Sequence, residues 1–262
     1  MGRSIFVCTV HIGSEPFWSS VQPRFIRAHI PNATLVAAVD DKLGRDFDFD
    51  HSEVMAGEHR DKLDQLARRV VLGMATTDDD ILVFLDGDAF PIRALTPFIV
   101  DVLQEVPLAA ICREENDEEY PHPSFCVTTV GFWKEVAGTW EVSSDPGAPT
   151  NELGGGRLRD LLRDRGVQWR RLLRSNAFDP HPVLFGIYED LIYHHGAGFR
   201  RPVTALDRKM CAERISLDGS ISRDDEYQSL LDVVAGQNQR MSNLFKRLIE
   251  HVPEFHRLLV LT

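Results

Sequence analysis

The sequence predicts a single α/β domain over residues 1–262, with a Rossmann-like, mostly parallel mixed sheet flanked by helices and a C-terminal helical tail. Two observations carry this prediction. In the first half of the chain, apolar β-branched runs alternate with amphipathic helical patterns, and strands joined by such crossovers pair in parallel. One run, ILVFL at 81–85, is apolar at every position, which is typical of a strand buried on both faces of a sheet. A length of 262 residues, of which 43% are hydrophobic, is sufficient for one such core.

Each element of the first half follows from its pattern. Strands are expected at 5–10, 33–39, 81–86 and 108–112, and helices at 16–29, 59–74 and 96–104. The helix over 59–74 places Leu63, Leu66 and Val70 on one face. Thr96-Pro97 is typical of a helix cap followed by proline in the first turn.

The second half of the chain is more mixed. It holds an acidic loop, a strand through Val130, a glycine-rich loop, a basic helix and two short strands. From Asp224 onward the pattern is helical. We therefore divide the single domain into 1–112, 113–205 and a tail over 206–262.

Composition excludes several classes of partner. A net charge of −11 argues against non-specific nucleic-acid binding, and no apolar stretch approaches the length of a membrane span. The cysteines Cys8, Cys112, Cys126 and Cys211 show no paired or metal-binding spacing. We expect buried thiols, a reducing compartment and a cytoplasmic protein.

Two carboxylates follow the apolar run directly. Asp86 and Asp88, separated by one glycine, would lie at the carboxyl edge of the sheet, where open α/β sheets bind their ligands. Two hard oxygen ligands suit Mg²⁺ or Mn²⁺, which can also hold the phosphates of a nucleotide. The alternative is an ordinary turn, because Asp-Gly is a common turn dipeptide.

A histidine pair, His194-His195, stands about a hundred residues later beside Gly196 and Gly198. This Asp-x-Asp, late-histidine arrangement after a βαβ half resembles the GT-A fold glycosyltransferases over most of residues 4–200. The resemblance implies a divalent metal that bridges the two phosphates of a nucleotide-diphosphate sugar donor. Asp88 is then the direct metal ligand, and Asp86 contacts the metal or the ribose.

The resemblance also bears on which histidine is the third ligand. His195 with Gly198 matches the H-x-x-G element of glycogenin-like transferases, which favours His195. Adjacent residues of a strand face opposite sides, so only one of the two should reach the metal. The downstream Lys-Pro-Trp of that family is absent here. Arg200, which stands in its place, is either a phosphate clamp or a surface charge.

Further donor contacts are implied at neighbouring strand ends. Thr9, Val10 and His11 end the first strand and Asp40 follows the second, edges that surround the base and ribose in the GT-A arrangement. Lys62 is a candidate contact to the diphosphate or an ordinary solvated lysine. Residues 1–112 thus form the nucleotide-binding half, and 113–205 form the acceptor half with the metal-binding histidine.

The acceptor side is less specific. An inverting transfer needs a carboxylate base, for which Glu152 and Asp190 are the candidates. Phe125 and Trp133 could pack on a sugar or belong to the core. The loop over 146–156 is expected to close over a bound donor. The acceptor could be a saccharide, a small molecule or a peptide.

The sequence therefore predicts a metal-dependent, hexosyltransferase-like glycosyltransferase. A haloacid-dehalogenase-type phosphatase also uses Asp-x-Asp, but carries it on the first strand, which here ends in Thr-Val-His. A sugar nucleotidyltransferase would show a glycine-rich, basic loop after that strand, and HIGSEPF does not provide one. The non-enzyme alternative is a pseudo-transferase that binds a nucleotide-sugar without turnover.

Overall fold

A computed structural model describes residues 2–13, 16–43, 47–114, 119–144, 155–177, 185–196, 240–252 and 254–260. The chain divides into two compact units. The first comprises 1–176 with 187–194, and the second comprises 177–186 with 195–262. Much of the second unit lies outside the described residues, so one domain over 1–262 stays a prediction.

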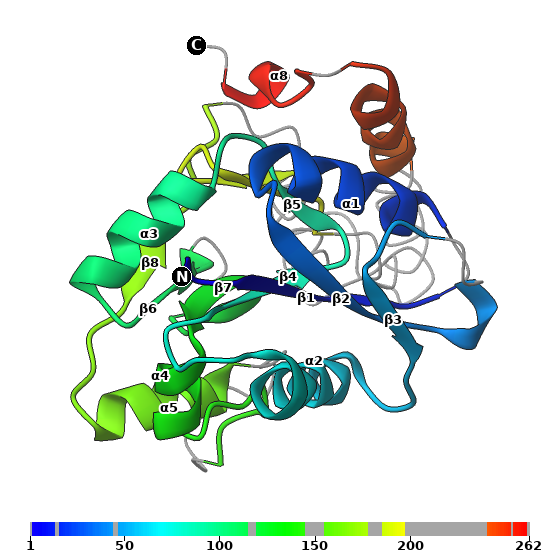
Figure 1. The fold of residues 1–262 in the computed structure, drawn as a ribbon. Helices are drawn as coiled ribbons and strands as arrows, with labels where there is room; N and C mark the ends of the chain where they lie inside the picture. Colours follow the sequence, from blue (N-terminus) through cyan, green and yellow to red (C-terminus); the bar gives the residue numbers. More distant parts are fainter. Residues whose placement is uncertain are drawn as a thin grey trace, which may run out of the picture. The chain divides into compact units, whose positions relative to one another are not determined.

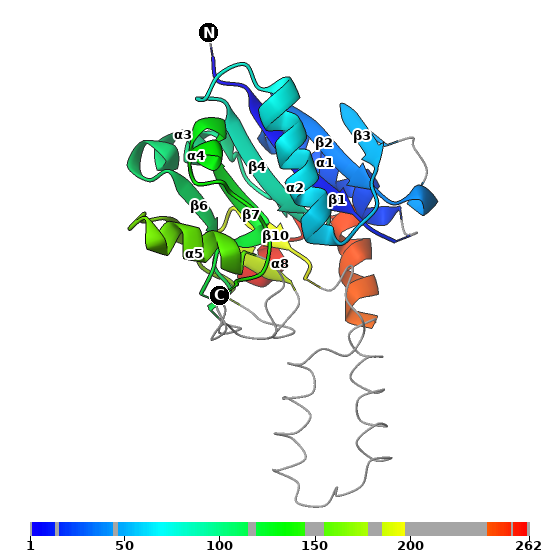
Figure 2. The same cartoon turned by 90° about the horizontal axis from the view of Figure 1, so that it is seen from below.

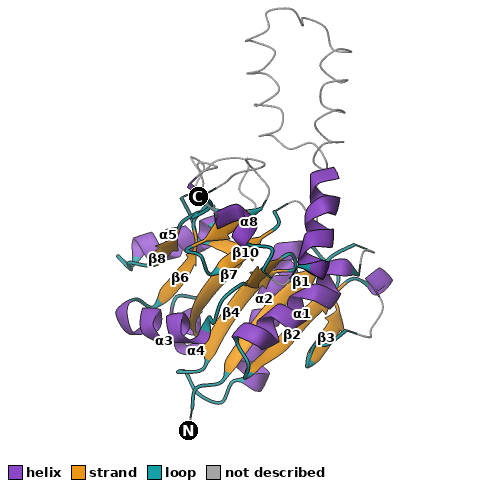
Figure 3. Ribbon diagram, turned by 90° about the horizontal axis from the view of Figure 1, so that it is seen from above, coloured by secondary structure: helices purple, strands orange, loops and turns teal. Residues whose placement is uncertain are grey.

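The first unit is built on a seven-stranded sheet with the order β3-β2-β1-β4-β7-β6-β8, which Figure 3 shows from one side. Strands β1 to β4 pair in parallel, β7 runs antiparallel between β4 and β6, and β8 is parallel to β6. The predicted fold class, a mostly parallel mixed sheet flanked by helices, is confirmed. The strands are β1 (Ile5–His11), β2 (Ala33–Val39), β3 (His51–Val54), β4 (Ile81–Asp86), β6 (Leu108–Ile111), β7 (His122–Thr129) and β8 (Arg170–Leu172).

Helices cover both faces of this sheet (Figure 1). One face carries α1 (Phe17–His29) and α3 (Thr96–Glu105), and the other carries α2 (His59–Arg69), α4 (Val130–Glu135) and α5 (Gly156–Asp164). Helix α2 lies over β1 and β2 and continues into a π-helical turn at Val70–Met74 (Figure 2). A short 3-10 turn at Asp41–Leu43 follows β2.

The central strands are apolar on both faces because each face is covered. In β4, Val83 and Leu85 pack toward α1 and α3, whereas Leu82 and Phe84 pack toward α2 and α4. The alternation of side chains along a strand therefore directs Asp86, the next residue, toward the α2 face. Cys8, Cys112 and Cys126 are buried as predicted, and Cys211 lies outside the described residues.

A second, three-stranded sheet has the order β5-β10-β9, with β5 at Ala89–Pro91, β9 at Gly186–Tyr188 and β10 at Ile192–His194. Strand β10 runs antiparallel to β5 in a register that pairs His194 with Ala89. This pairing brings the end of β10 beside the Asp86-Gly87-Asp88 turn, which immediately precedes β5.

In the second unit, residues 240–251 are helical and a short helix α8 spans Arg257–Val260. Within this unit, Phe185 stacks on Phe245 with ring centroids 3.8 Å apart, and the Ala177 N–H donates to the Leu259 carbonyl. The helical pattern expected from Asp224 is present from residue 240, and the stretch before it lies outside the described residues. No helix in the described ranges combines the length and the apolarity needed to cross a membrane.

Gly155, the residue before α5, is required by both conformation and space. Its φ is +91°, and a Cβ at this position would lie 2.0 Å from the Pro121 carbonyl oxygen. Gly166 is a matched control, because its φ is +63° but a Cβ there meets no described atom within 4 Å. We expect Gly166→Ala to lower the free energy of unfolding by roughly 1 kcal/mol, the cost of a left-handed conformation alone. Gly155→Ala should cost clearly more in chemical denaturation, and equal costs would contradict the steric argument.

Asp64 ties α2 to the segment after α4. Its carboxylate accepts hydrogen bonds from the Thr139 hydroxyl at 2.6 Å and the Trp140 N–H at 2.9 Å. Burial raises the pKa of Asp64 from 3.8 to about 6, although both hydrogen bonds act to lower it. Between these pH values the folded protein binds more protons than the unfolded chain, so this contribution to stability falls as the pH rises.

Asp64→Asn removes that titration. The free energy of unfolding of the wild type, relative to that of Asp64→Asn, should therefore decrease between about pH 4 and about pH 6. Urea denaturation of both proteins across this range measures it. A difference that does not change with pH would show that Asp64 titrates normally.

Candidate metal and nucleotide site

The candidate site lies where the direction of strand addition reverses. From β1 the chain adds β2 and β3 on one side and then returns to place β4 on the other side of β1. In open α/β sheets, the carboxyl ends of the strands at such a point form a ligand-binding crevice. The carboxyl ends of β1 and β4, at His11 and Asp86, meet here.

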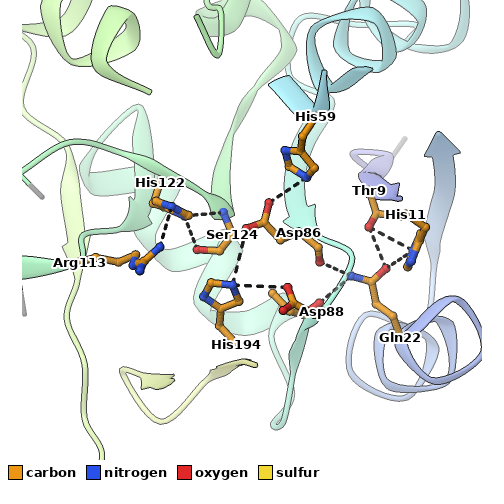
Figure 4. A network of polar contacts seen from close by, with 11 residues as sticks. Thr9, His11, Gln22, His59, Asp86, Asp88, Arg113, His122, Ser124 and His194 are labelled. Carbon is orange, nitrogen blue, oxygen red and sulfur yellow. Dashed lines mark hydrogen bonds and ion pairs between the residues drawn. The ribbon is translucent and has the colours of Figure 1, made fainter. Parts of the chain in front are cut away.

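Three side chains converge at this edge (Figure 4). Each of Asp86, Asp88 and His194 offers one ligand atom, and these atoms all lie within 4.8 Å of one another. His194 Nε2 is 3.4 Å from Asp88 Oδ1 and 3.7 Å from Asp86 Oδ2. Asp88 and His194 are buried, and Asp86 is partly buried.

The histidine beside the aspartates is His194 and not His195, which the sequence analysis favoured. The reason is the register of β10, which places His194 opposite Ala89, one residue from Asp88. His195 is fully buried, and its Nε2 lies 2.7 Å from the Ser242 hydroxyl of the second unit. The H-x-x-G spacing favours His195, whereas the histidine that lies beside the aspartates is its neighbour His194. Which of the two binds a metal stays a prediction.

More histidines and an arginine surround the carboxylates. His59, the first residue of α2, places Nε2 at 3.2 Å from Asp86 Oδ1. His122 lies with its ring centroid 6.1 Å from that of His194. Its two ring nitrogens lie 3.1 Å from Arg113 Nη1 and 2.7 Å from the Ser124 hydroxyl.

Burial dominates the electrostatics of the site. It raises the pKa of Asp86, and the charge of Asp88 adds to this, while His59, His194 and Arg113 act in the opposite direction. Burial also lowers the pKa of His122 well below its ordinary value, and the Arg113 charge lowers it further. His122 is therefore neutral at physiological pH.

The two polar residues at the end of β1, Thr9 and His11, contact Gln22 of α1. The Thr9 hydroxyl donates to Gln22 Oε1 at 2.8 Å, and His11 Nε2 lies 3.0 Å from the same oxygen. Val10 is fully buried in the core on the α2 face. Burial lowers the pKa of His11 to about 4, so its ring is neutral. Thr9 and His11 both have protein partners in α1. The expected base and ribose contacts of Thr9, Val10 and His11 stay predictions.

Lys62 is neither solvated nor directed at the aspartate pair. It is buried, and its ammonium group lies 2.5 Å from Asp40 Oδ1, while Asp40 Oδ2 accepts the Gly13 N–H at 2.7 Å. Burial alone would raise the pKa of Asp40, but the Gly13 and Lys62 hydrogen bonds together hold it below its ordinary value. Asp40 is therefore an ionised carboxylate fixed at the end of β2.

Of the candidate bases Asp190 and Glu152 and the candidate phosphate clamp Arg200, the described residues include Asp190 alone. Asp190 belongs to the turn before β10, where its backbone N–H and its carboxylate both pair with the Ser175 hydroxyl at 2.9 Å. That contact gives Asp190 a structural role in the turn. Glu152 and Arg200 lie outside the described residues, as does most of the predicted lid over 146–156. Phe125 and Trp133 are buried core residues.

Comparison with known proteins finds distant similarity to solved structures. No protein-family model and no curated protein matches the chain. Among solved structures, the chain is similar to residues 1–349 of TarS from S. aureus, at 10% identity and a TM-score of 0.43, covering 69% of that chain. It is also similar to a galactosyltransferase, LgtC, in complex with donor and acceptor sugar analogues (12%, 0.39), and to an active-site mutant of LgtC (12%, 0.41). The two LgtC matches cover 99% of the LgtC chain. All three matches cover 86% of the chain described here.

The residues present fit a divalent cation. Asp86 Oδ1 is buried, and although His59 Nε2 lies 3.2 Å away, this oxygen accepts no hydrogen bond from any described residue. Two carboxylates and one imidazole form a donor set that suits Mn²⁺ or Mg²⁺, with the nitrogen favouring Mn²⁺. A cation would also offset the repulsion between the two buried carboxylates.

Sequence reasoning missed two partners of the aspartate turn. His59 enters the sequence analysis only as the first residue of the helix expected over 59–74, and Gln22 is not singled out there. Gln22 had a recognisable signal, because it lies between Trp18 and Ile26 at i, i+4 and i+8 on the buried stripe of α1. A polar residue on such a stripe needs buried partners.

The two adjacent histidines can be distinguished by metal binding. His194→Ala should raise the dissociation constant for Mn²⁺ at least about tenfold, because even outer-shell changes have effects of that size. His195→Ala should leave Mn²⁺ binding unchanged and lower stability, since it removes the contact with Ser242. Calorimetric titration and thermal unfolding of both variants test this. The reverse pattern would return the ligand assignment to His195.

Proposed function

We propose that this chain is a glycosyltransferase that depends on a divalent metal and transfers a sugar from a nucleotide-diphosphate donor to an acceptor. The observation that carries the proposal is the convergence of Asp86, Asp88 and His194 at the switch point of the sheet. It joins the Asp-x-Asp and late-histidine pattern of the sequence in one place. Manganese as the metal, a hexose as the sugar and a cytoplasmic location are parts of the same proposal.

Asp86, Asp88 and His194 would hold the metal. When bound, it would supply positive charge to the two phosphates of the leaving nucleoside diphosphate. The carboxylates themselves cannot bind a diphosphate, because like charges repel. The buried positions of Asp88 and His194 keep the ligand set away from bulk solvent, which strengthens its electrostatic interactions.

The chain's own residues provide further contacts for the donor. His59 and Arg113 bring positive or hydrogen-bonding groups to the side of Asp86. Asp40 is held ionised at the end of β2, and two of its lone-pair positions are used by Gly13 and Lys62. A carboxylate has about four such positions, so Asp40 can still accept hydrogen bonds from ribose hydroxyls.

The acceptor-side base remains a proposal. Asp190 is engaged by Ser175 in its turn, so Glu152 is the better of the two candidates from the sequence. Its loop, preceding Gly155, would bring it to the site by closing after the donor binds.

A screen of nucleotide-sugars with Mn²⁺, reading released nucleoside diphosphate, tests the function directly. Asp88→Asn should lower turnover by about two orders of magnitude or more, as loss of one dominant electrostatic stabiliser does. Asp101→Asn, an exposed change on α3, is the matched control and should retain full activity.

Three outcomes separate the alternatives. Full turnover in excess chelator would rule out metal dependence. Mn²⁺-dependent binding of a nucleoside diphosphate without any turnover would favour the pseudo-transferase. Release of inorganic phosphate from a phosphomonoester would favour a phosphatase.

A further inference from the structure

We infer that Gln22 is a positioning residue that fixes the Asp86-Gly87-Asp88 turn in its metal-binding geometry. The inference rests on the proposed metal site and extends it to a side chain of α1. Gln22 is fully buried, and its amide nitrogen donates two hydrogen bonds to the turn: to the Asp86 carbonyl at 2.7 Å and to the Ala89 carbonyl at 2.6 Å. These two carbonyls flank the glycine and Asp88.

The other end of the amide is held just as firmly. Gln22 Oε1 accepts the Thr9 hydroxyl at 2.8 Å and faces His11 Nε2 at 3.0 Å. Both N–H groups of the amide thus donate, and its oxygen accepts from Thr9 and also from His11 in the tautomer that carries a proton on Nε2. The orientation of the amide follows from its partners, because a reversed amide would set an oxygen against two carbonyl oxygens. Figure 4 shows Gln22 between the end of β1 and the aspartate turn.

The hydrogen bonds of Gln22 restrict the backbone of a turn that would otherwise be free to change conformation. The turn contains a glycine, which is the residue with the most backbone freedom, between two carboxylates that repel each other. Asp86 Oδ1 lies 3.2 Å from His59 Nε2 but accepts no hydrogen bond from the described residues, so this oxygen does not hold the turn in place. A clamp on the backbone carbonyls keeps both carboxylates directed at one point without occupying their oxygens.

The test uses Mn²⁺ as the probe on the full chain. Gln22→Met keeps the length of the side chain but cannot donate to the two carbonyls. We expect the dissociation constant for Mn²⁺ to rise about tenfold, as for other outer-shell partners, and amide hydrogen exchange at Gly87 to Ala89 to accelerate. Ser19→Ala is the matched control, a buried polar change on the same helix whose hydroxyl donates to the Pro16 carbonyl and to no other group among the described residues. It should leave both readouts unchanged.

A second variant keeps the inference testable if Gln22→Met does not fold. Thr9→Val removes one of the two donors that anchor Gln22 and should weaken Mn²⁺ binding in the same direction by a smaller factor. The positioning role would be overturned if Asp88→Asn lost Mn²⁺ affinity while Gln22→Met retained it. If Gln22→Met does not fold, the same comparison is made with Thr9→Val. Either result would leave the proposed function intact. Wild-type protein that binds no Mn²⁺ would overturn both.

Discussion

The burial of two carboxylates at the end of a two-sided apolar strand is the constraint on which the rest of this site depends. Strand β4 must be buried for the sheet to have a core on each face, so its last residue enters a region with little water. Charges in such a region are costly unless they are compensated. The raised pKa of Asp86 expresses that cost.

Elements from distant parts of the chain meet this requirement together. Helix α1 contributes Gln22, α2 contributes His59, and β10 contributes His194, which is more than a hundred residues away in sequence from the turn. Each of these residues contacts a different group of the aspartate turn. Gln22 binds backbone carbonyls, whereas the two histidines approach carboxylate oxygens. The fold therefore brings together backbone support and ligand atoms without making them compete for the same groups.

The contrast between predicted and missed features has physical causes. Strands β1, β2 and β4 were predictable because continuous apolar runs report burial on both faces. Strand β3 was missed because all four of its residues are exposed at the sheet edge, and β5 because it has three residues and contains Pro91. The choice between His194 and His195 depends on the register of β10 with β5, a pairing between segments far apart in sequence that no local pattern encodes. Lys62 was predictable as part of a helix, but its burial against Asp40 depends on how α2 lies over β2.

Asp40, Asp86 and Asp88 lie at the same edge of the sheet but differ in the cationic groups that the chain places beside them. Asp40 has an ammonium group from Lys62 at 2.5 Å, and its pKa is lowered. Among the described residues, the ion-pair partners of Asp86 are both imidazoles, and burial raises the pKa of Asp86. In the described part of the chain, the carboxylate after β2 thus forms an ion pair with a lysine, whereas the ion pairs of Asp86 are with imidazoles. Since Asp86 and Asp88 share the same point with His194, a divalent ion there would supply what Lys62 supplies to Asp40, with charge left over for a diphosphate.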